Sequence, residues 1–378
     1  MLSTNVTMGR KVLQFEDDLS KYFNISETVT NNSGSSANLL AISALANIQT
    51  ENNLKPGDEV IVPALSWSTT IWPLIQNNLV PVFVDIDPLT LNIDPNKIED
   101  AISEKTSAIM IVPVYGNPCE MDAITSICQK YKLTLIEDTC ESLGASYDGK
   151  PLGTFGRVGT YSFYFSHHMT TLEGGVCITN DFDLAEMMRI LRAHGWIREM
   201  KKPNKYIDLV SDKDIDPRFL FVNLGYNLRL TEPQGAMGII QLPKLDDFVN
   251  SRRQSANFLL ENLEKYGSVL SFQKETNKGR HSWFGFPLVI KNDATFSVAD
   301  LRSHLEKSGI ETRPIISGDM TQQPAFNLYE HKTSGSLDFS KNIMKNGLAI
   351  ACHQSLDSKS LQYISNSFDD FMRQKGIF

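Results

Sequence analysis

The chain has 378 residues, enough for two domains with sizeable cores. Its 36 Lys and Arg residues against 44 Asp and Glu residues give a formal net charge of −8, and 41% of the residues are hydrophobic. This balance argues against non-specific binding to nucleic acid or to an anionic membrane. The first eighteen residues lack the apolar core of a signal peptide, and no apolar run reaches the length that spans a bilayer, so we expect a cytoplasmic protein.

The first motif along the chain is a serine-rich start to an apolar helix. Ser33, Gly34, Ser35 and Ser36 precede ANLLAISALANI. The free N–H groups of a first helical turn bind phosphate well, and a glycine and hydroxyl groups allow close approach. Serine-rich caps begin many helices, however, so the motif alone leaves both interpretations open.

Short apolar runs alternate with helical patterns from residue 59 to residue 180. The runs with strand character are EVIVP (59–63), VPVFVD (80–85), SAIMIVPV (107–114), LTLIED (133–138), TYSFYF (160–165) and GGVCITN (174–180). Their nearly continuous apolar character is typical of strands that are covered on both faces. Between two of them, residues 117–132 have a helical pattern in which Pro118 suits the first turn. The alternation predicts an α/β fold with a mostly parallel sheet.

Several side chains with possible chemistry follow these strands. Trp67 lies after the first run, where an aromatic ring could stack on a ligand or belong to the core. Asp138 ends a buried run, at the sheet edge where ligands of open α/β sheets bind, or it could simply form a turn. Ser162 precedes a turn with two adjacent histidines, His167 and His168. The pair could be metal ligands, a catalytic base, or two polar residues at a strand end.

The pattern changes after Gly225. TEPQ (231–234) has the form of a capping box, and a mainly helical stretch follows to about Gly267 with an interruption near Pro243. FGFPLVI (284–290), a helix around VADLRSHLEKSG and a strand near IETRP predict a smaller α/β unit. We therefore expect a large domain over residues 1–240 and a small C-terminal domain over residues 241–378.

The cysteines argue against a metal centre. Cys119, Cys128, Cys140, Cys177 and Cys352 are odd in number and widely spaced, with no CxxC pair. Scattered thiols of this kind are typical of core residues in a reducing compartment. We expect neither a zinc site nor an iron–sulfur cluster.

Taken together, these motifs describe a site for pyridoxal phosphate. The serine-rich helix start would hold the phosphate, Trp67 would stack on the ring, and Asp138 would keep the pyridine nitrogen protonated. Ser162 offers a further hydroxyl to the phosphate. The lysine that normally binds this cofactor covalently is missing from the histidine turn.

The chain resembles the DegT/DnrJ/EryC1/StrS family of sugar aminotransferases. The resemblance rests, from about residue 8 to residue 355, on SGSSAN, DEVIVPALSWSTT, PVFVDID, YGNP, EDTCESLGA, GTFG, SFYFSHHMTTLEGG, LGYNLRLTEPQGAMG and GIETRP. It implies the dimeric fold-type I architecture of pyridoxal phosphate enzymes. In the aminotransferases of this family a lysine lies six residues before the glutamate of the EGG signature, and here that position is His167. The SHH…EGG form resembles the nucleotide-sugar 3-dehydratase branch, of the kind that lacks an iron–sulfur cluster.

The resemblance also implies roles for individual residues. It implies that the phosphate is held by Gly34, Ser35, Ser36 and Ser162, with Asn227 reaching in from the partner subunit. Glu141 stands where aminotransferases often have glutamine, beside the hydroxyl of the cofactor ring. Arg229 and Arg313 are candidates for anionic groups of the substrates, or they form structural ion pairs.

The reaction that the resemblance implies is removal of the C3 hydroxyl from a nucleotide-linked 4-keto-6-deoxyhexose, with GDP-linked 4-keto-6-deoxymannose favoured, for 3,6-dideoxysugar biosynthesis. The cofactor would act as pyridoxamine phosphate and be restored by L-glutamate. Histidine cannot hold the cofactor covalently as lysine does, but it serves as a general base and acid near neutral pH. Two alternatives remain: a sugar aminotransferase, or a lysine-to-histidine variant of one, and an inactive relative with a regulatory role.

Overall fold

The computed structural model describes residues 6–210 and 214–377, which form two larger sheets and one small three-stranded sheet. The larger sheet has eight strands in the order β1-β9-β8-β5-β4-β2-β3-β14. β1 and β9 pair antiparallel, as do β9 and β8, whereas the five remaining pairings are parallel. The strands are β1 (Glu27–Asn31), β2 (Glu59–Pro63), β3 (Val80–Val84), β4 (Thr106–Ile111), β5 (Thr134–Asp138), β8 (Val158–Ser162), β9 (Gly175–Thr179) and β14 (Lys332–Thr333).

Helices cover both faces of this sheet, as the apolar runs predict. In β4, Ala108 and Met110 pack into one core with α2 and α6, whereas Ile109 and Ile111 pack into another with α5. Side chains of a strand alternate between its faces, so apolar residues at every position require cover on both sides. The helices before the small sheet are α1 (Arg10–Phe23), α2 (Gly34–Leu45), α3 (Ser68–Gln76), α4 (Pro95–Ile98), α5 (Met121–Tyr131), α6 (Phe182–Arg192), α7 (Asn204–Ile207), α8 (Glu232–Gln241) and α9 (Leu245–Leu263).

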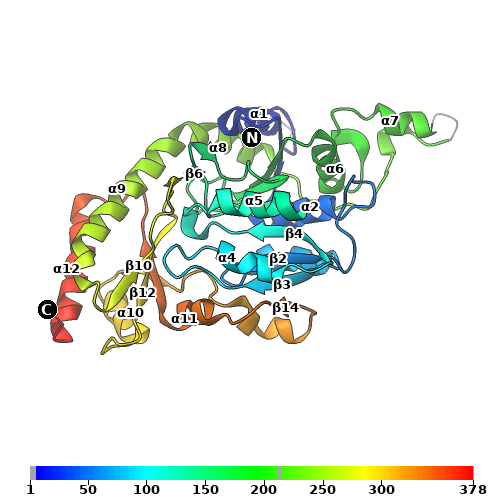
Figure 1. Ribbon diagram of the computed structural model, residues 1–378. Coiled ribbons are helices and arrows are strands. Elements are labelled where there is room, and N and C mark those ends of the chain that lie inside the picture. The colour runs from blue at the N-terminus through cyan, green and yellow to red at the C-terminus, as the bar shows by residue number, and fades with distance from the viewer. Residues whose placement is uncertain (1–5, 211–213, 378) are drawn as a thin grey trace.

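A second sheet with four antiparallel strands lies in the C-terminal part. Its order is β10-β12-β15-β13, and α9, α10 and α12 contribute to the same apolar core. Figure 1 shows α9 as the long helix that leads from the large sheet to this smaller unit, where it lies beside α12. The elements are β10 (Leu270–Phe272), β12 (Gly285–Ile290), β13 (Thr312–Arg313), β15 (Gly347–Ala351), α10 (Val298–Lys307), α11 (Asp338–Asn346) and α12 (Ser358–Gln374).

Segments from the C-terminal part also return to the large one. β14 pairs with β3 of the large sheet, and β11 (Gly279–Arg280) pairs with β6 (Ser146–Tyr147), which also pairs with β7 (Lys150–Pro151). The boundary between residues 240 and 241 stays a prediction. The large and the small unit are therefore joined by strand pairing as well as by the chain itself. The segment after β11 brings residues to the histidine turn.

Two local expectations were wrong for identifiable reasons. Pro118 lies outside α5, because the Asn92 amide donates to the carbonyls of Asn117 and Pro118 at 3.0 and 2.9 Å and holds this stretch in a loop. The run 160–165 leaves the sheet at Ser162, whose hydroxyl accepts a hydrogen bond from the Tyr164 N–H at 3.3 Å. The capping box at residues 231–234 is present as the sequence predicts.

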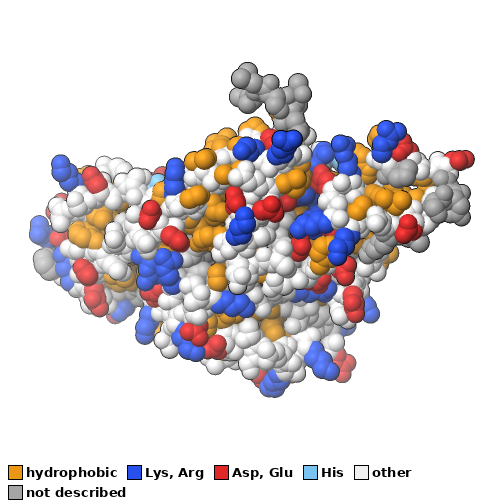
Figure 2. Space-filling view, turned by 90° about the horizontal axis from the view of Figure 1, so that it is seen from above, with side chains coloured by type: hydrophobic (Ala, Val, Ile, Leu, Met, Phe, Trp, Pro, Cys, Tyr) orange, Lys and Arg blue, Asp and Glu red, His pale blue; other side chains and the backbone are white. Residues whose placement is uncertain are grey.

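Charged side chains of both signs are mixed over the face of the molecule shown in Figure 2, with no large field of one sign. Within the described residues, no helix combines the length and the apolar character that crossing a bilayer requires. The same residues contain no group of three or more His, Cys, Asp or Glu side chains arranged to hold a metal ion.

Candidate active site

The predicted site residues gather at the carboxyl edge of the parallel strands. Asp138 ends β5, Ser162 ends β8, and Trp67 precedes α3 shortly after β2. These three strands run in the same direction, so their carboxyl ends meet at one edge, where open α/β sheets bind ligands. The amino end of α2 reaches the same edge, because it packs against Ser162.

Close approach of α2 to β8 explains the glycine at the start of the helix. A Cβ atom on Gly34 would lie 2.5 Å from the Cβ of Ser162 and 2.9 Å from the Sγ of Cys140. The hydroxyl of Ser33 caps the helix by accepting the Ser36 N–H at 3.0 Å. Ser35 is exposed at the edge, where its hydroxyl donates to Thr69 at 3.0 Å. The first turn therefore presents small polar groups next to Ser162, as phosphate binding requires.

The carboxylate of Asp138 is buried and held by three donors. Its Oδ2 accepts hydrogen bonds from the Asn38 amide at 2.8 Å and the Thr70 hydroxyl at 2.6 Å, and its Oδ1 accepts the Cys140 N–H at 3.2 Å. Asn38 itself is fixed by the Thr160 hydroxyl, which donates to its Oδ1 at 2.6 Å. This network orients a strand-end carboxylate, which is the arrangement that a protonated ring nitrogen needs as a partner.

Glu141 lies one turn further on and has a different electrostatic environment. Its Oε2 accepts the Tyr115 N–H at 3.2 Å. Burial and, to a smaller extent, the charge of Asp138 together raise the pKa of the Glu141 carboxyl to about 8, against the lowering effect of that hydrogen bond. At neutral pH Glu141 is therefore mainly a protonated acid that can donate a hydrogen bond.

The two histidines lie in a turn that is held at both ends. The Phe163 N–H donates to the Gly174 carbonyl at 2.8 Å, and the Thr171 N–H donates to the Phe163 carbonyl at 3.0 Å. Within the turn, the His167 N–H donates to the Tyr164 carbonyl at 3.0 Å. These backbone hydrogen bonds fix the positions of the main-chain atoms from which both imidazole side chains extend.

His167 is half-buried and His168 is fully buried, and the two rings make different contacts. The His167 ring stacks on Phe284 with centroids 4.9 Å apart, and its Nδ1 is buried without a hydrogen-bond partner. His168 is fully buried, and its Nε2 bonds to the Ser282 carbonyl at 3.1 Å. Burial lowers the pKa of His167 to about 4, with a further contribution from the charge of Arg252. The same two causes lower the pKa of His168 well below its ordinary value.

The remaining predicted residues lie at the periphery. Trp67 is 54% exposed. Asn227 is exposed, and its Oδ1 accepts a hydrogen bond from Arg229 at 3.2 Å, while Arg229 also lies 3.4 Å from the His194 Nε2. Arg313 is exposed and bonds to Glu311 at 2.6 Å. The roles assigned to these residues stay predictions.

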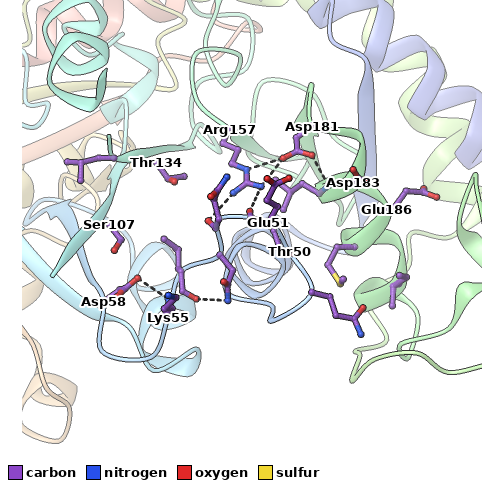
Figure 3. Close-up of a pocket in the computed structure, with 18 of the residues that line it drawn as sticks. Thr50, Glu51, Lys55, Asp58, Ser107, Thr134, Arg157, Asp181, Asp183 and Glu186 are labelled. Atoms are coloured by element: carbon purple, nitrogen blue, oxygen red, sulfur yellow. Dashed lines mark hydrogen bonds and ion pairs between the residues drawn. The ribbon is translucent and has the colours of Figure 1, made fainter. Parts of the chain in front are cut away.

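A separate cavity lies at the opposite edge of the sheet. It has a volume of about 1130 Å³ and lies next to Asp58, Thr106 and Thr134, where β2, β4 and β5 begin. Figure 3 shows Arg157 and Asp181 joined in its wall, where the guanidinium donates to the carboxylate at 2.9 Å. This cavity contains none of the predicted site residues, and its paired charges are typical of a structural surface.

The structure adds three residues to those predicted for the site. Asn38 and Thr70 orient Asp138, and Phe284 packs on His167. Asn38 and Thr70 belong to SGSSAN and WSTT, so those motifs contained the signal. Phe284 comes from the segment before β12, far along the chain, and no local pattern connects it with the histidine turn.

A mostly parallel sheet with helices on both faces, a helix start beside a strand-end serine, and a buried strand-end aspartate define the class: the fold-type I enzymes that use pyridoxal phosphate. The chain belongs to the DegT/DnrJ/EryC1/StrS aminotransferase family, whose sequence profile matches residues 1–369. The predicted family and fold class are confirmed.

Several relatives cover nearly the whole chain. GDP-4-keto-6-deoxy-D-mannose 3-dehydratase of Yersinia pseudotuberculosis is 42% identical over 368 residues, which is 96% of this chain and 92% of that protein. A solved GDP-4-keto-6-deoxymannose-3-dehydratase with a trapped PLP–glutamate geminal diamine has a TM-score of 0.88 at 38% identity, and covers 96% of this chain and 93% of its own. A substituted variant of that enzyme with bound GDP-perosamine has a TM-score of 0.91 at 40% identity, with coverage of 96% and 93%.

Proposed function

We propose that this chain is a 3-dehydratase of nucleotide-linked 4-keto-6-deoxyhexoses, with GDP-4-keto-6-deoxymannose as its substrate and pyridoxal phosphate, in its pyridoxamine form, as its cofactor. The observation that carries the proposal is His167 in the turn between β8 and β9, at the edge that holds Gly34 and Asp138. No lysine occurs from residue 158 to residue 175. The relatives named above support both the substrate and the cofactor.

The residues at the edge fit the cofactor. Gly34, Ser35, Ser36 and Ser162 would hold the phosphate, since the lack of a Cβ at Gly34 lets the first turn of α2 approach Ser162 closely. Trp67 would stack on the ring, and Asp138 would pair with its nitrogen. Glu141, protonated at neutral pH, would donate to the ring hydroxyl. When bound, the cofactor supplies an electron sink that makes cleavage of the C3–oxygen bond possible.

His167 moves the proton in this reaction. Its imidazole is neutral at pH 7, so a ring nitrogen can accept a proton as general base. The resulting imidazolium is a strong acid because burial disfavours it, and it protonates the C3 hydroxyl as that group leaves. Because position 167 is not a lysine, the protein neither holds the cofactor covalently nor completes amino transfer. The products are therefore a 4-keto-3-deoxy sugar and ammonia.

Arg229 and Arg313 are the side chains we assign to the anionic groups of the two substrates. A guanidinium binds carboxylate or phosphate through two parallel hydrogen bonds. Arg229 faces a neutral amide and a histidine, so its charge is free for a ligand. Arg313 would exchange its exposed contact with Glu311 for a ligand at little cost, since exposed ion pairs stabilise a protein weakly. L-glutamate, which would recharge the cofactor, and the sugar nucleotide both carry such groups.

A homodimer would complete the site. Phe165 and Leu172 in the histidine turn are 64% and 63% exposed, and Leu224 in the loop before Asn227 is 88% exposed. Exposed large apolar side chains are often covered by a partner, and a second copy would bring Asn227 to the phosphate. We also propose a cytoplasmic location for the enzyme. Sedimentation should show a dimer, and a fully active monomer would contradict this arrangement.

The direct test combines the protein with pyridoxamine phosphate and GDP-4-keto-6-deoxymannose. We expect stoichiometric ammonia and a 3-deoxy product by mass spectrometry, and sustained turnover when L-glutamate is added. A stable aminosugar would instead indicate an aminotransferase, and no reaction would indicate an inactive relative. Parallel reactions with CDP-, dTDP- and UDP-linked sugars test the nucleotide.

A further inference from the structure

Arg252, on α9, is a buried cation whose hydrogen-bond partners are all neutral. Its side chain is 1% exposed. Its Nε donates to the Gln354 amide oxygen at 3.0 Å, and its Nη1 donates to the carbonyls of Trp283, Phe284 and Cys352 at 3.2, 2.9 and 3.0 Å. Its Nη2 is buried with no hydrogen-bond partner. Among the described residues, no ion pair joins Arg252 to a carboxylate.

Other buried arginines of the chain are arranged differently. Arg192 is also 1% exposed, but it bonds to Glu16 at 2.8 Å and to Glu199 at 3.1 Å. Arg189 pairs with Glu27 and Glu186. Burial of a charge without a counter-ion is costly, and it lowers the pKa of Arg252 to about 10. A neutral side chain could donate hydrogen bonds to the same carbonyls, so stability does not explain why a charged residue occupies this position.

Two of the three carbonyls that Arg252 binds, those of Trp283 and Phe284, belong to the segment that both histidines contact. In residues 281–284, the Phe284 ring stacks on His167 and the Ser282 carbonyl bonds to His168. The same segment is tied to the large sheet, since the Ser282 N–H donates to the Gly116 carbonyl at 3.1 Å and the Phe284 N–H donates to Tyr115 at 2.8 Å. Arg252 thus holds in place the segment, residues 281–284, that contacts both histidines.

The charge of Arg252 also reaches the histidines. It lowers the pKa of His167, of His168 and of His353, which follows β15. The titratable groups around this cluster are His168 on the turn itself, His281 on the bracing segment, Cys352 and His353 after β15, and Cys140 and Glu141 after β5. Of these, His167 and His281 further lower the pKa of His168 by electrostatic repulsion. A hydrogen bond with the Cys140 backbone acts in the opposite direction on His167 and raises its pKa.

We propose that Arg252 is a positioning residue for His167: it braces segment 281–284 against the imidazole and, as an unpaired buried cation, adds to the effect of burial in keeping that imidazole in its base form. This inference rests on the proposed function only for its consequence in catalysis. The protonation state of His167 is a property of the free protein, and it is measurable whatever reaction the protein performs.

The test is an NMR titration of the cofactor-free protein labelled with ¹³C-histidine, with His167→Asn to assign the signal. In the wild type we expect the His167 signal to stay in its neutral form between about pH 5 and pH 8. Arg252→Met removes the charge, and the His167 titration midpoint should rise above that of the wild type but stay below that of an ordinary histidine, because burial is the larger cause of the lowering. Arg252→Lys keeps the charge with fewer hydrogen bonds, and its midpoint should stay near that of the wild type.

Arg253→Met is the matched control. Arg253 lies on the same helix and donates to the His281 carbonyl at 2.8 Å, but its charge is paired with Glu275 at 2.7 Å. Its removal should leave the His167 midpoint unchanged. An unchanged midpoint in Arg252→Met, or an equal shift in Arg252→Lys or Arg253→Met, overturns the proposal. If Arg252→Met does not fold, Arg252→Lys decides, because this variant keeps the charge. A His167 midpoint in Arg252→Lys that rises to its value in the denatured protein would refute the role of the charge.

If the proposed reaction also holds, the acid limb of the rate profile should move to higher pH in Arg252→Met together with the NMR midpoint. Failure of the reaction with a shifted midpoint would count against the proposed function and leave the role of Arg252 intact. A working reaction with an unshifted midpoint would do the reverse.

Discussion

Substitution of the two adjacent histidines should separate a chemical role from a structural one. His167→Asn keeps a polar side chain of moderate size but removes the base. Because the pKa of His167 is about 4, almost every molecule carries the neutral base at pH 7. The substitution therefore removes the whole general-base contribution, and we expect dehydration to slow by roughly 10²–10⁴-fold. Stability should change less than on substitution of His168, since the His167 Nδ1 has no hydrogen-bond partner to lose.

His168→Asn should behave in the opposite way. His168 is fully buried, and its loss leaves the Ser282 carbonyl without the partner it has at 3.1 Å. An unsatisfied buried group costs about 1–3 kcal/mol of the free energy of unfolding. We expect a lower melting temperature and a dehydration rate much nearer to that of the wild type, once the folded fraction is taken into account.

The assay is a single-turnover reaction with pyridoxamine phosphate and the sugar nucleotide, followed by chromatography of the sugar, with a thermal melt of each variant. His167→Lys is a useful third variant, because a lysine should let borohydride fix the cofactor on the protein, which the wild type should not allow. If His167→Asn reacts near the wild-type rate while His168→Asn folds but is inactive, the base is assigned to the wrong histidine.

Three further outcomes follow from the geometry. Gly34→Ala places a Cβ 2.5 Å from Ser162, so it should cost about 1–3 kcal/mol in stability and weaken cofactor binding in a fluorescence titration, whereas Gly285→Ala, whose nearest contact is 3.4 Å, should do neither. Because protonation inactivates a base whose pKa is lowered to about 4, the dehydration rate should fall only as the pH drops through that value; a limb centred near 6.5 would contradict the assignment of His167. Replacement of all five cysteines by alanine should leave glutamate-driven turnover intact if the protein folds, and loss of activity in a folded, cofactor-binding variant would point to a missed redox centre.

The sequence predicted those parts of the site that lie on single motifs. Asp138, Ser162 and Gly34 each sit at the end of an element whose apolar pattern is local, so their meeting at one sheet edge follows from strand direction alone. The strand at residues 59–63 agrees with β2 at both ends. Pro118 was placed wrongly because side-chain hydrogen bonds from Asn92 decide the conformation there, and local helix preference does not contain that information.

Tertiary contacts account for what the sequence left out. Phe284 and Arg252 belong to the C-terminal half of the chain, and only the packing of α9 and β12 against the large sheet brings them to the histidine turn. In the sequence, Arg252 is one basic residue in SRRQSAN beside Arg253, and nothing distinguishes the two. The structure distinguishes them, because one is paired with a carboxylate and the other is not.

The difference between these arginines bears on how a histidine serves in place of a lysine. A histidine that accepts a proton and then returns it to a leaving hydroxyl has to be neutral before the reaction and strongly acidic after the transfer. Burial against Phe284 supplies both properties, because desolvation disfavours the imidazolium. A carboxylate beside the ring would work against this by stabilising the imidazolium. The chain instead places a cation behind the turn and satisfies it with carbonyl oxygens, which hold Arg252 without cancelling its charge.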